Sequence, residues 1–296
     1  AARTLRIGEE TLRYSKLVLA LGADQIRLPG EGNAAGDILT VNDLDDYAMF
    51  RAAIAGKKRV AIIGAGLIGC EFANDLAATG YAVDIIDIAG QALGRLLPPE
   101  GGALLQSKLA ALGVQWQLGT SVAAVDHADS GYTVKLANGT TLQADVVLSA
   151  VGLKPRTALA AAAGIKVNRG IAVNRRLETS AAEVYALGDC AEIEGLVMPY
   201  VMPIMHATRA LAQTLAGKPM AVSFPAMPVM VKTPACPTIV SPPAAGAEGQ
   251  WQVEASGEGV KSLFVGADGK LLGFALNGSA TAERAKLAPQ LPPVLA

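Results

Sequence analysis

The segment RVAIIGAGLIGCEFANDLAATGYAVDIID, residues 59–87, decides the fold. It opens with an apolar run typical of a buried strand (59–64), continues with a helical pattern that ends at Gly80, and closes with a second strand-like run (81–87). Between the first strand and the helix lies GAGLIG (64–69), which fits the pattern G-x-G-x-x-G. Strand, glycine-rich turn, helix and strand in this order predict a βαβ unit of a nucleotide-binding sheet.

The glycine-rich loop predicts a dinucleotide site at the N-terminus of the following helix. Gly64 permits the tight turn, Gly66 lets a pyrophosphate approach the backbone, and Gly69 allows the helix to pack closely on the strand. Free main-chain amides and the helix dipole favour an anion at this position. The loop residues expected to contact the dinucleotide are Gly64, Ala65, Gly66, Leu67, Ile68 and Gly69.

Asp87 ends the second strand, 23 residues after Gly64. A carboxylate at this position accepts hydrogen bonds from the two ribose hydroxyls of the adenosine and repels a 2′-phosphate. No Arg follows Asp87 in the next four residues, so the sequence favours NAD(H) over NADP(H). Asp84 lies in the middle of the same strand, and we expect it to face a neighbouring helix or solvent.

Another strand-like run, LVLALGA (17–23), precedes this unit and is similar to ADVVLSAVG (144–152). At an offset of 130 residues Gly22 matches Gly152, and a hairpin pattern precedes both runs. This agreement predicts a duplication in which the first residues close a nucleotide-binding domain whose own glycine-rich loop lies upstream of residue 1. The alternative is a single edge strand added to one nucleotide-binding domain.

Composition restricts the remaining possibilities. The chain is 51% hydrophobic with 4% aromatic residues and a net charge of −1, which suits buried parallel strands and favours neither nucleic acid nor an anionic membrane as partner. No apolar run reaches the roughly 20 residues of a transmembrane helix. Cys70, Cys190 and Cys236 stand alone, without metal-ligand spacing, so we expect no metal site and a reducing, cytoplasmic location.

The second half of the chain contains a further strand end with a polar residue. Residues 184–187 form an apolar run that is followed by Gly188 and Asp189. An Asp in this place can accept hydrogen bonds from a sugar-like diol, although a Gly-Asp pair is also typical of a simple turn. The last segment predicts an antiparallel sheet, with strands at PVMVKT, TIVS, QWQVEA, KSLFVG and LLGFAL.

The series GAGLIGCEFA, AVGLKPRT and TSAAEVYALGDCA resembles the FAD-dependent pyridine nucleotide-disulfide oxidoreductases related to glutathione reductase. The stretches MPVMVKTPACPTIVSPP (227–243) and GKLLGFALNG (269–278) are similar to the rubredoxin reductase branch of that superfamily. The resemblance implies an α/β fold with two Rossmann-like nucleotide-binding domains, the first incomplete, and a C-terminal α+β interface domain. The implied boundaries are 1–35 and 153–218 for the FAD-binding domain, 36–152 for the NAD(H)-binding domain and 219–296 for the interface domain.

The resemblance also implies an activity and the residues that serve it. NADH would reduce FAD, and the electrons would pass to rubredoxin or a similar small iron–sulfur carrier, without catalytic acid–base residues. By position, Glu71 would face the nicotinamide and the flavin, Asp189 would bind the ribityl chain, Val201 would lie near the flavin pyrimidine edge, and Lys232 would lie over the flavin region. Gly152 is implied on the NAD side, and Ala20, Gly22 and Gly188 on the FAD side.

Several alternatives stay open at this point. VKTPACP departs from the WSDQ-like pattern of ferredoxin reductases, which favours rubredoxin, but a ferredoxin reductase component or another NAD(P)H:FAD oxidoreductase remains the runner-up. A disulfide reductase would carry a catalytic His in the C-terminal domain, whereas the only histidines are His127 and His206. A non-enzyme reading is an NAD-binding sensor or an inactive fragment, since without the upstream loop we expect the 296-residue chain to hold FAD weakly.

Overall fold

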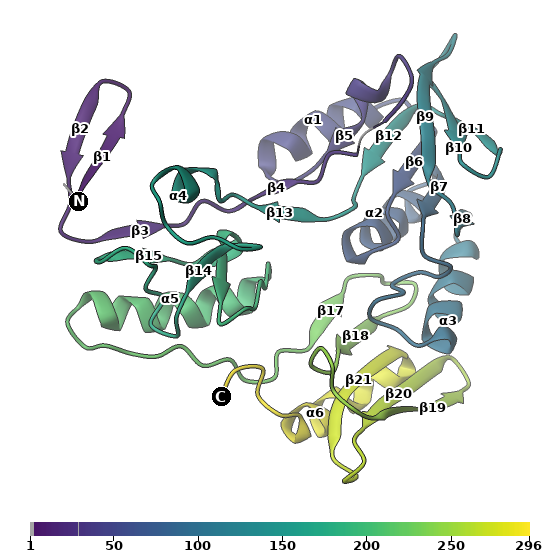
Figure 1. Cartoon of the computed structure of the whole chain (residues 1–296). Coiled ribbons are helices and arrows are strands. Elements are labelled where there is room, and N and C mark those ends of the chain that lie inside the picture. The colour runs from purple at the N-terminus through teal and green to yellow at the C-terminus, as the bar shows by residue number, and fades with distance from the viewer. Residues whose placement is uncertain (1–2, 29) are drawn as a thin grey trace. The chain divides into compact units, whose positions relative to one another are not determined.

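The computed structural model describes residues 3–28 and 30–296 (Figure 1). The chain divides into two compact units. The first comprises Ala1–Asp24, Leu153–Pro225 and Pro293–Ala296, and the second comprises Gln25–Gly152 and Ala226–Pro292. In the part of the chain that the structure describes, no helix combines the length and the apolar composition needed to cross a membrane.

The second unit contains a five-stranded parallel sheet with strand order β5–β12–β6–β7–β8. Its strands are β5 (Leu39–Thr40), β6 (Arg59–Ile63), β7 (Ala82–Asp87), β8 (Val114–Leu118) and β12 (Val146–Ser149). β12 is buried along its whole length and β6 is buried except at its first residue. Such continuous burial is typical of parallel strands that are covered on both faces. The predicted α/β class is therefore confirmed.

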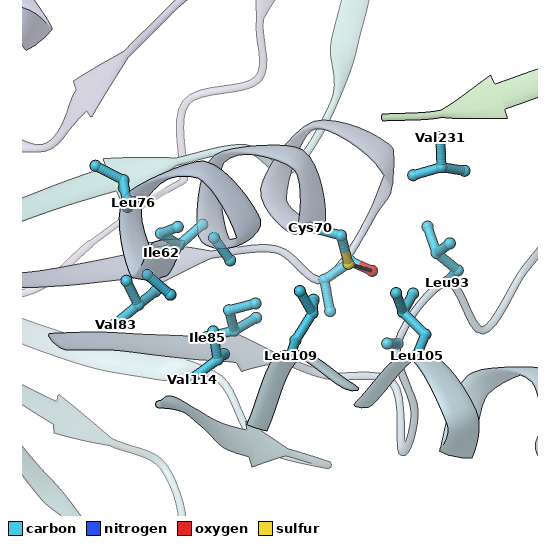
Figure 2. Close-up of a cluster of buried hydrophobic side chains, with 14 of the residues drawn as sticks. Ile62, Cys70, Leu76, Val83, Ile85, Leu93, Leu105, Leu109, Val114 and Val231 are labelled. Atoms are coloured by element: carbon cyan, nitrogen blue, oxygen red, sulfur yellow. Dashed lines mark hydrogen bonds between the residues drawn. The ribbon is translucent and has the colours of Figure 1, made fainter. Parts of the chain in front are cut away.

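Three helices belong to this sheet: α1 (Leu44–Ile54), α2 (Leu67–Ala78) and α3 (Pro99–Ala110). β6, α2 and β7 form the predicted βαβ unit, and α2 ends before Gly80, which adopts a positive φ of 93°. Figure 2 shows part of the buried cluster that these elements share, with Ile85 of β7 beside Leu109 of α3. A separate antiparallel sheet consists of β9 (Val122–His127), β10 (Tyr132–Leu136) and β11 (Thr141–Ala144).

The C-terminal part of the same unit is an antiparallel sheet, as predicted. Its strand order is β17–β18–β21–β20–β19, and each neighbouring pair is antiparallel. The strands are β17 (Val229–Val231), β18 (Thr238–Ser241), β19 (Gln250–Ser256), β20 (Gly259–Val265) and β21 (Leu271–Gly278). The short helix α6 (Arg284–Leu287) follows, and its Leu287 packs against Phe274 and Leu276 of β21.

The C-terminal sheet shares a hydrophobic core with the parallel sheet. Val231, Cys236 and Val240 belong to the same buried cluster as Cys70 of α2 and Leu105 of α3. Val231 is seen beside this cluster in Figure 2. The sheets therefore form one packed body, and burial of such apolar side chains contributes roughly 1.5–3 kcal/mol each.

The first unit consists of short elements from distant parts of the chain. Its strands are β1 (Thr4–Ile7), β2 (Glu10–Arg13), β3 (Leu17–Leu19), β4 (Ala23–Gln25), β13 (Leu153–Pro155), β14 (Ile171–Val173), β15 (Val184–Ala186) and β16 (Ala191–Ile193). Its helices are α4 (Ala158–Ala162) and α5 (Val201–Leu215). β14 pairs with β16 and β3 pairs with β15, both in parallel.

The pairing of β3 with β15 supports the duplication predicted from the sequence. Leu17, Val18 and Leu19 lie opposite Val184, Tyr185 and Ala186. The hairpin that precedes each copy is also present, as β1–β2 in the first and β10–β11 in the second. The strand that ends near Gly22 therefore pairs with β15 in the first unit rather than with the edge of the five-stranded sheet.

Candidate functional site

The glycine-rich loop joins the carboxyl end of β6 to the N-terminus of α2. Gly66 is the N-cap of α2, and no side chain in the described part of the chain caps the helix. The first main-chain amides of an uncapped helix have no partner within the helix, so they are available to an anion. Leu67 is half-buried and Ile68 is exposed, whereas Ala65 is buried.

The three fingerprint glycines have different surroundings. Gly64 has a φ of +112°, and a Cβ there would lie 2.7 Å from the carbonyl oxygen of Ala150. A Cβ on Gly69 would overlap the carbonyl oxygen of Gly64, so the close packing expected of Gly69 is present. A Cβ on Gly66 would meet nothing within 4 Å. The protein thus leaves open space at the one glycine that is expected to admit a pyrophosphate.

Asp87 lies at the end of β7, beside this loop. Its Oδ2 accepts a hydrogen bond of 2.5 Å from the amide of Ala65, and its Oδ1 accepts one of 2.7 Å from the amide of Ala89. Each carboxylate oxygen keeps a further lone pair, so both ribose hydroxyls can still be bound. The sequence did not indicate that Asp87 also braces the loop, because the contact with Ala65 depends on how β6 and β7 are aligned.

Asp84 was expected to face a neighbouring helix or solvent, and the structure adds a strand residue as its partner. Asp84 is half-buried, and its Oδ1 accepts a 3.5 Å hydrogen bond from Nε2 of Gln117 on the neighbouring strand β8. Burial raises the pKa of this carboxyl above its usual value, while the bond from Gln117 lowers it. The partner of Asp84 is therefore a strand residue, and Asp84 stays apart from the dinucleotide loop.

An open cavity lies beside Asp87 at the carboxyl ends of β7 and β8. The amide of Thr120 donates to the carbonyl oxygen of Asp87 at 3.1 Å, which places the cavity next to the expected ribose position. The residues that line it are Ile88, Gly119, Thr120, Ser121, Ala137 and Asn138. Sequence reasoning missed this group; the signal available was that ligands in open α/β sheets bind beyond the carboxyl ends of the strands.

Gly152 lies close to the same loop through β12. The amide of Ala150 donates to the carbonyl oxygen of Ile63 at 2.7 Å, and Gly152 has a φ of +114°. The carbonyl oxygen of Gly152 accepts a 3.0 Å bond from Ile26. The strand that carries Gly152 thus ends beside the loop that carries Gly64.

Glu71 and Lys232 also meet in this unit. Oε1 of Glu71, in the second turn of α2, accepts a 2.8 Å hydrogen bond from the main-chain amide of Lys232. The Lys232 side chain is exposed. The two residues that the resemblance assigned to the flavin region are therefore joined through the main chain, which the sequence did not indicate.

The remaining predicted residues lie in the first unit, near the paired strands β3 and β15. The amide of Leu187 donates to the carbonyl oxygen of Leu19, and the amide of Leu21 donates to Sγ of Cys190 at 3.3 Å. These bonds bring Ala20 and Gly22 to the turn that carries Gly188 and Asp189. Val201 begins helix α5, as expected, and its side chain is 73% exposed.

Asp189 is the unusual group in this turn. Its Oδ1 is buried and has no hydrogen-bond partner among residues 3–28 and 30–296, and burial raises the pKa of the carboxyl. An unpartnered buried polar atom costs about 1–3 kcal/mol, so such atoms call for an explanation. A hydroxyl of a bound ligand would satisfy Asp189, and the residues present therefore fit the ribityl chain of a flavin.

Comparison with known proteins agrees with this arrangement. Residues 2–214 match the family model described as pyridine nucleotide-disulphide oxidoreductase, and residues 221–291 match the model described as rubredoxin binding C-terminal domain. The chain belongs to the pyridine nucleotide-disulphide oxidoreductase family.

Individual relatives extend this assignment. A rubredoxin-NAD(+) reductase from Alcanivorax borkumensis is 52% identical over 97% of this chain and 75% of the relative. A second rubredoxin-NAD(+) reductase, from Acinetobacter baylyi, is 47% identical with the same coverage of both chains. A crystal structure of a ferredoxin reductase from Rhodopseudomonas palustris superposes with a TM-score of 0.86 at 28% identity, covering 99% of this chain and 75% of that one.

Within this oxidoreductase family the cysteines of the present chain are not placed for dithiol chemistry. Cys70, Cys190 and Cys236 are all buried, and none forms a disulfide. Burial raises the pKa of the Cys70 thiol to about 12, and it also raises the pKa of the other two thiols. A thiol must ionise to act as a nucleophile, so these three are structural.

Proposed function

We propose that this protein is a flavoprotein reductase that uses NADH to reduce FAD and passes the electrons to rubredoxin. One observation carries the proposal. The dinucleotide loop, with Asp87 bonded to its Ala65, shares a hydrophobic core with a C-terminal segment that matches the rubredoxin-binding domain. The two rubredoxin-NAD(+) reductases that share about half of its residues support the same function.

The residues of this chain bind and orient the two cofactors. The first amides of α2 would hold the NADH pyrophosphate over the open space at Gly66, and Asp87 would accept the ribose hydroxyls. Because a carboxylate repels a 2′-phosphate, Asp87 selects NADH over NADPH. The cavity next to Asp87, lined by Ile88, Thr120 and Asn138 among others, would receive the adenine.

The first unit would hold the flavin. Asp189 would bind the ribityl hydroxyls, with Ala20, Gly22 and Gly188 along the adjoining strand ends and Val201 near the pyrimidine edge. When bound, FAD accepts a hydride from NADH and releases electrons singly to a one-electron acceptor. No protein acid or base is required for this chemistry. Glu71 would orient the nicotinamide, and Lys232 would either tune the charge near the flavin, as the resemblance implies, or face the electron acceptor.

The domain division at residues 35, 152 and 218 stays a prediction, since the two compact units group the C-terminal sheet with the central one and do not test it. A cytoplasmic location is also proposed, and the three buried free thiols support it because reduced cysteines are typical of that compartment.

Steady-state kinetics with two acceptors test the function. The FAD-loaded protein is assayed with NADH and either rubredoxin or a [2Fe–2S] ferredoxin. We expect kcat/KM for rubredoxin to exceed that for ferredoxin by at least tenfold. Equal values, or a preference for ferredoxin, would favour the ferredoxin reductase alternative, and an absence of NADH oxidation with either acceptor would favour the sensor alternative.

A further inference from the structure

The loop between β17 and β18 is unusually well anchored. Its sequence from Lys232 to Pro237 is KTPACP, in which the two prolines carry no amide hydrogen. Every other main-chain amide in the segment donates a hydrogen bond. The four bonds are Lys232 to Glu71 Oε1 (2.8 Å), Thr233 to the Val231 carbonyl (3.0 Å), Ala235 to Asn74 Oδ1 (3.1 Å) and Cys236 to the Thr233 carbonyl (2.9 Å).

Two of these four acceptors are side chains of α2. Glu71 and Asn74 are three residues apart, so they lie on the same face of the helix. Asn74 is only 2% exposed, and its Nδ2 donates to Oδ1 of Asp75 at 3.1 Å, which fixes its amide with the oxygen toward Ala235. The helix that opens at the dinucleotide loop therefore holds the loop of the C-terminal domain directly.

Buried polar groups hold the other side of the loop. The hydroxyls of Thr233 and Thr238 both donate to the carbonyl oxygen of Cys236, at 2.7 and 3.0 Å. Nδ2 of Asn277 donates to the Thr238 hydroxyl at 2.9 Å. The Cys236 side chain itself is buried in the core shared with α2. The loop backbone is thus fixed from two directions, which favours a single conformation.

The exposed group that this backbone presents is the ammonium of Lys232. The side chain makes no ion pair or hydrogen bond with any residue in the described ranges. A fixed backbone leaves the Cα of Lys232 in one place while the side chain remains free to reach an anionic group. Lys232 lies in the segment that matches the rubredoxin-binding model, so an acidic group of the protein acceptor is the chemical partner that it suits.

We propose that Asn74 is a positioning residue for the acceptor step, because it fixes the loop Lys232–Cys236 on α2 and so places Lys232 for an acidic group of the electron acceptor. The inference rests on the proposed function for the identity of that acceptor. The anchoring itself rests only on the contacts described above.

Thiol labelling tests the anchoring without any assay of activity. Cys236 is protected only while the loop is closed, so its alkylation rate, followed by peptide mass spectrometry, reports loop opening. Loss of the bond to Ala235 in Asn74→Ala should raise that rate about tenfold, with Cys190 of the first unit unchanged. Asp75→Asn changes an exposed neighbour and keeps both an acceptor oxygen for Nδ2 of Asn74 and the bond to Ala235, so this control should label at nearly the original rate. An unchanged rate in Asn74→Ala would overturn the anchoring.

A double-mutant cycle tests the positioning of Lys232. Asn74→Ala should lower kcat/KM for rubredoxin about tenfold and leave the NADH–ferricyanide rate unchanged. In a Lys232→Ala background the same substitution should have no further effect. Additive losses, or an equal loss in the ferricyanide reaction, would overturn the role in the acceptor step. If the unaltered protein does not reduce rubredoxin at all, the proposed function fails instead, and the labelling result stands by itself.

Discussion

Alanine substitutions at two glycines of the same loop should have different effects: Gly64→Ala should lower stability, and Gly66→Ala should weaken NADH binding. At Gly64 the backbone has a φ of +112°, which costs an L-residue about 1–2 kcal/mol. The new Cβ would also lie 2.7 Å from the carbonyl oxygen and 2.9 Å from the carbonyl carbon of Ala150, against ordinary carbon contacts of about 3.5–4.0 Å. Overpacking of this kind costs about 1–3 kcal/mol, so Gly64→Ala should reduce the free energy of unfolding by about 2–5 kcal/mol.

At Gly66 neither cost applies. Its φ is −79°, and a Cβ would meet no atom within 4 Å, so Gly66→Ala should change stability by less than about 0.5 kcal/mol. The added methyl group instead fills the space through which the pyrophosphate approaches the amides. We expect the KM for NADH to rise at least tenfold, which is about 1.4 kcal/mol of lost binding.

Thermal unfolding and NADH kinetics on the two variants are the assay. Gly64→Ala should lower Tm by at least about 4 °C, and Gly66→Ala should leave it within about 2 °C while the KM for NADH rises. The FAD-loaded protein supplies the kinetics, and unfolding is followed in the absence of NADH. If Gly66→Ala were as unstable as Gly64→Ala, or if it kept the original KM, the assignment of open space at Gly66 to the pyrophosphate would be refuted.

Three further predictions concern titratable groups. Asp87→Ala removes the ribose acceptor and the brace on Ala65, so the KM for NADH should rise at least tenfold while that for NADPH changes less; parallel changes for both cofactors would contradict this. Burial holds the pKa of the Asp189 carboxyl above its value in the unfolded chain. The folded state is therefore favoured while the carboxyl is protonated, and this contribution to stability is lost as the pH rises from the unfolded pKa through the folded pKa. In flavin-free protein, melting curves should therefore show Asp189→Asn more stable than the original at pH 7, with the gain vanishing below about pH 3.9. Burial raises the pKa of the Cys70 thiol to about 12, so the contribution of this thiol to stability is present below about pH 8.5 and is lost as the pH rises to 12. At pH 9 iodoacetamide should label Cys70 only at the global unfolding rate, and faster labelling would refute its burial.

The sequence predicted the βαβ unit well because each of its elements depends on residues that are close together in the chain. The run from β6 through Gly64 and α2 to β7 is encoded within residues 59–87, and the structure confirms it. The repeat of Gly22 and Gly152 predicted that the first residues belong to a second domain, and the pairing of β3 with β15 agrees with this. The strands of the C-terminal domain were also predicted, but their order in the sheet was not.

Contacts between residues far apart in the chain could not be predicted where no sequence repeat related them. Asn74 and Ala235 are 161 positions apart, and their bond depends on how the C-terminal sheet packs on α2. The brace from Asp87 to Ala65 depends in the same way on the alignment of two strands. Asp84 was expected beside a helix or solvent because a strand pattern does not show which neighbour will supply a partner such as Gln117.

An anaerobic two-step flavin titration tests the central claim most directly. NADH is added to the FAD-loaded protein in stoichiometric amount, and oxidised rubredoxin follows, while the visible flavin absorbance is recorded. We predict that NADH bleaches the flavin and that rubredoxin restores its absorbance as its own iron is reduced. A flavin that NADH leaves oxidised, or one that rubredoxin leaves reduced, would contradict the assignment of this chain as a rubredoxin reductase.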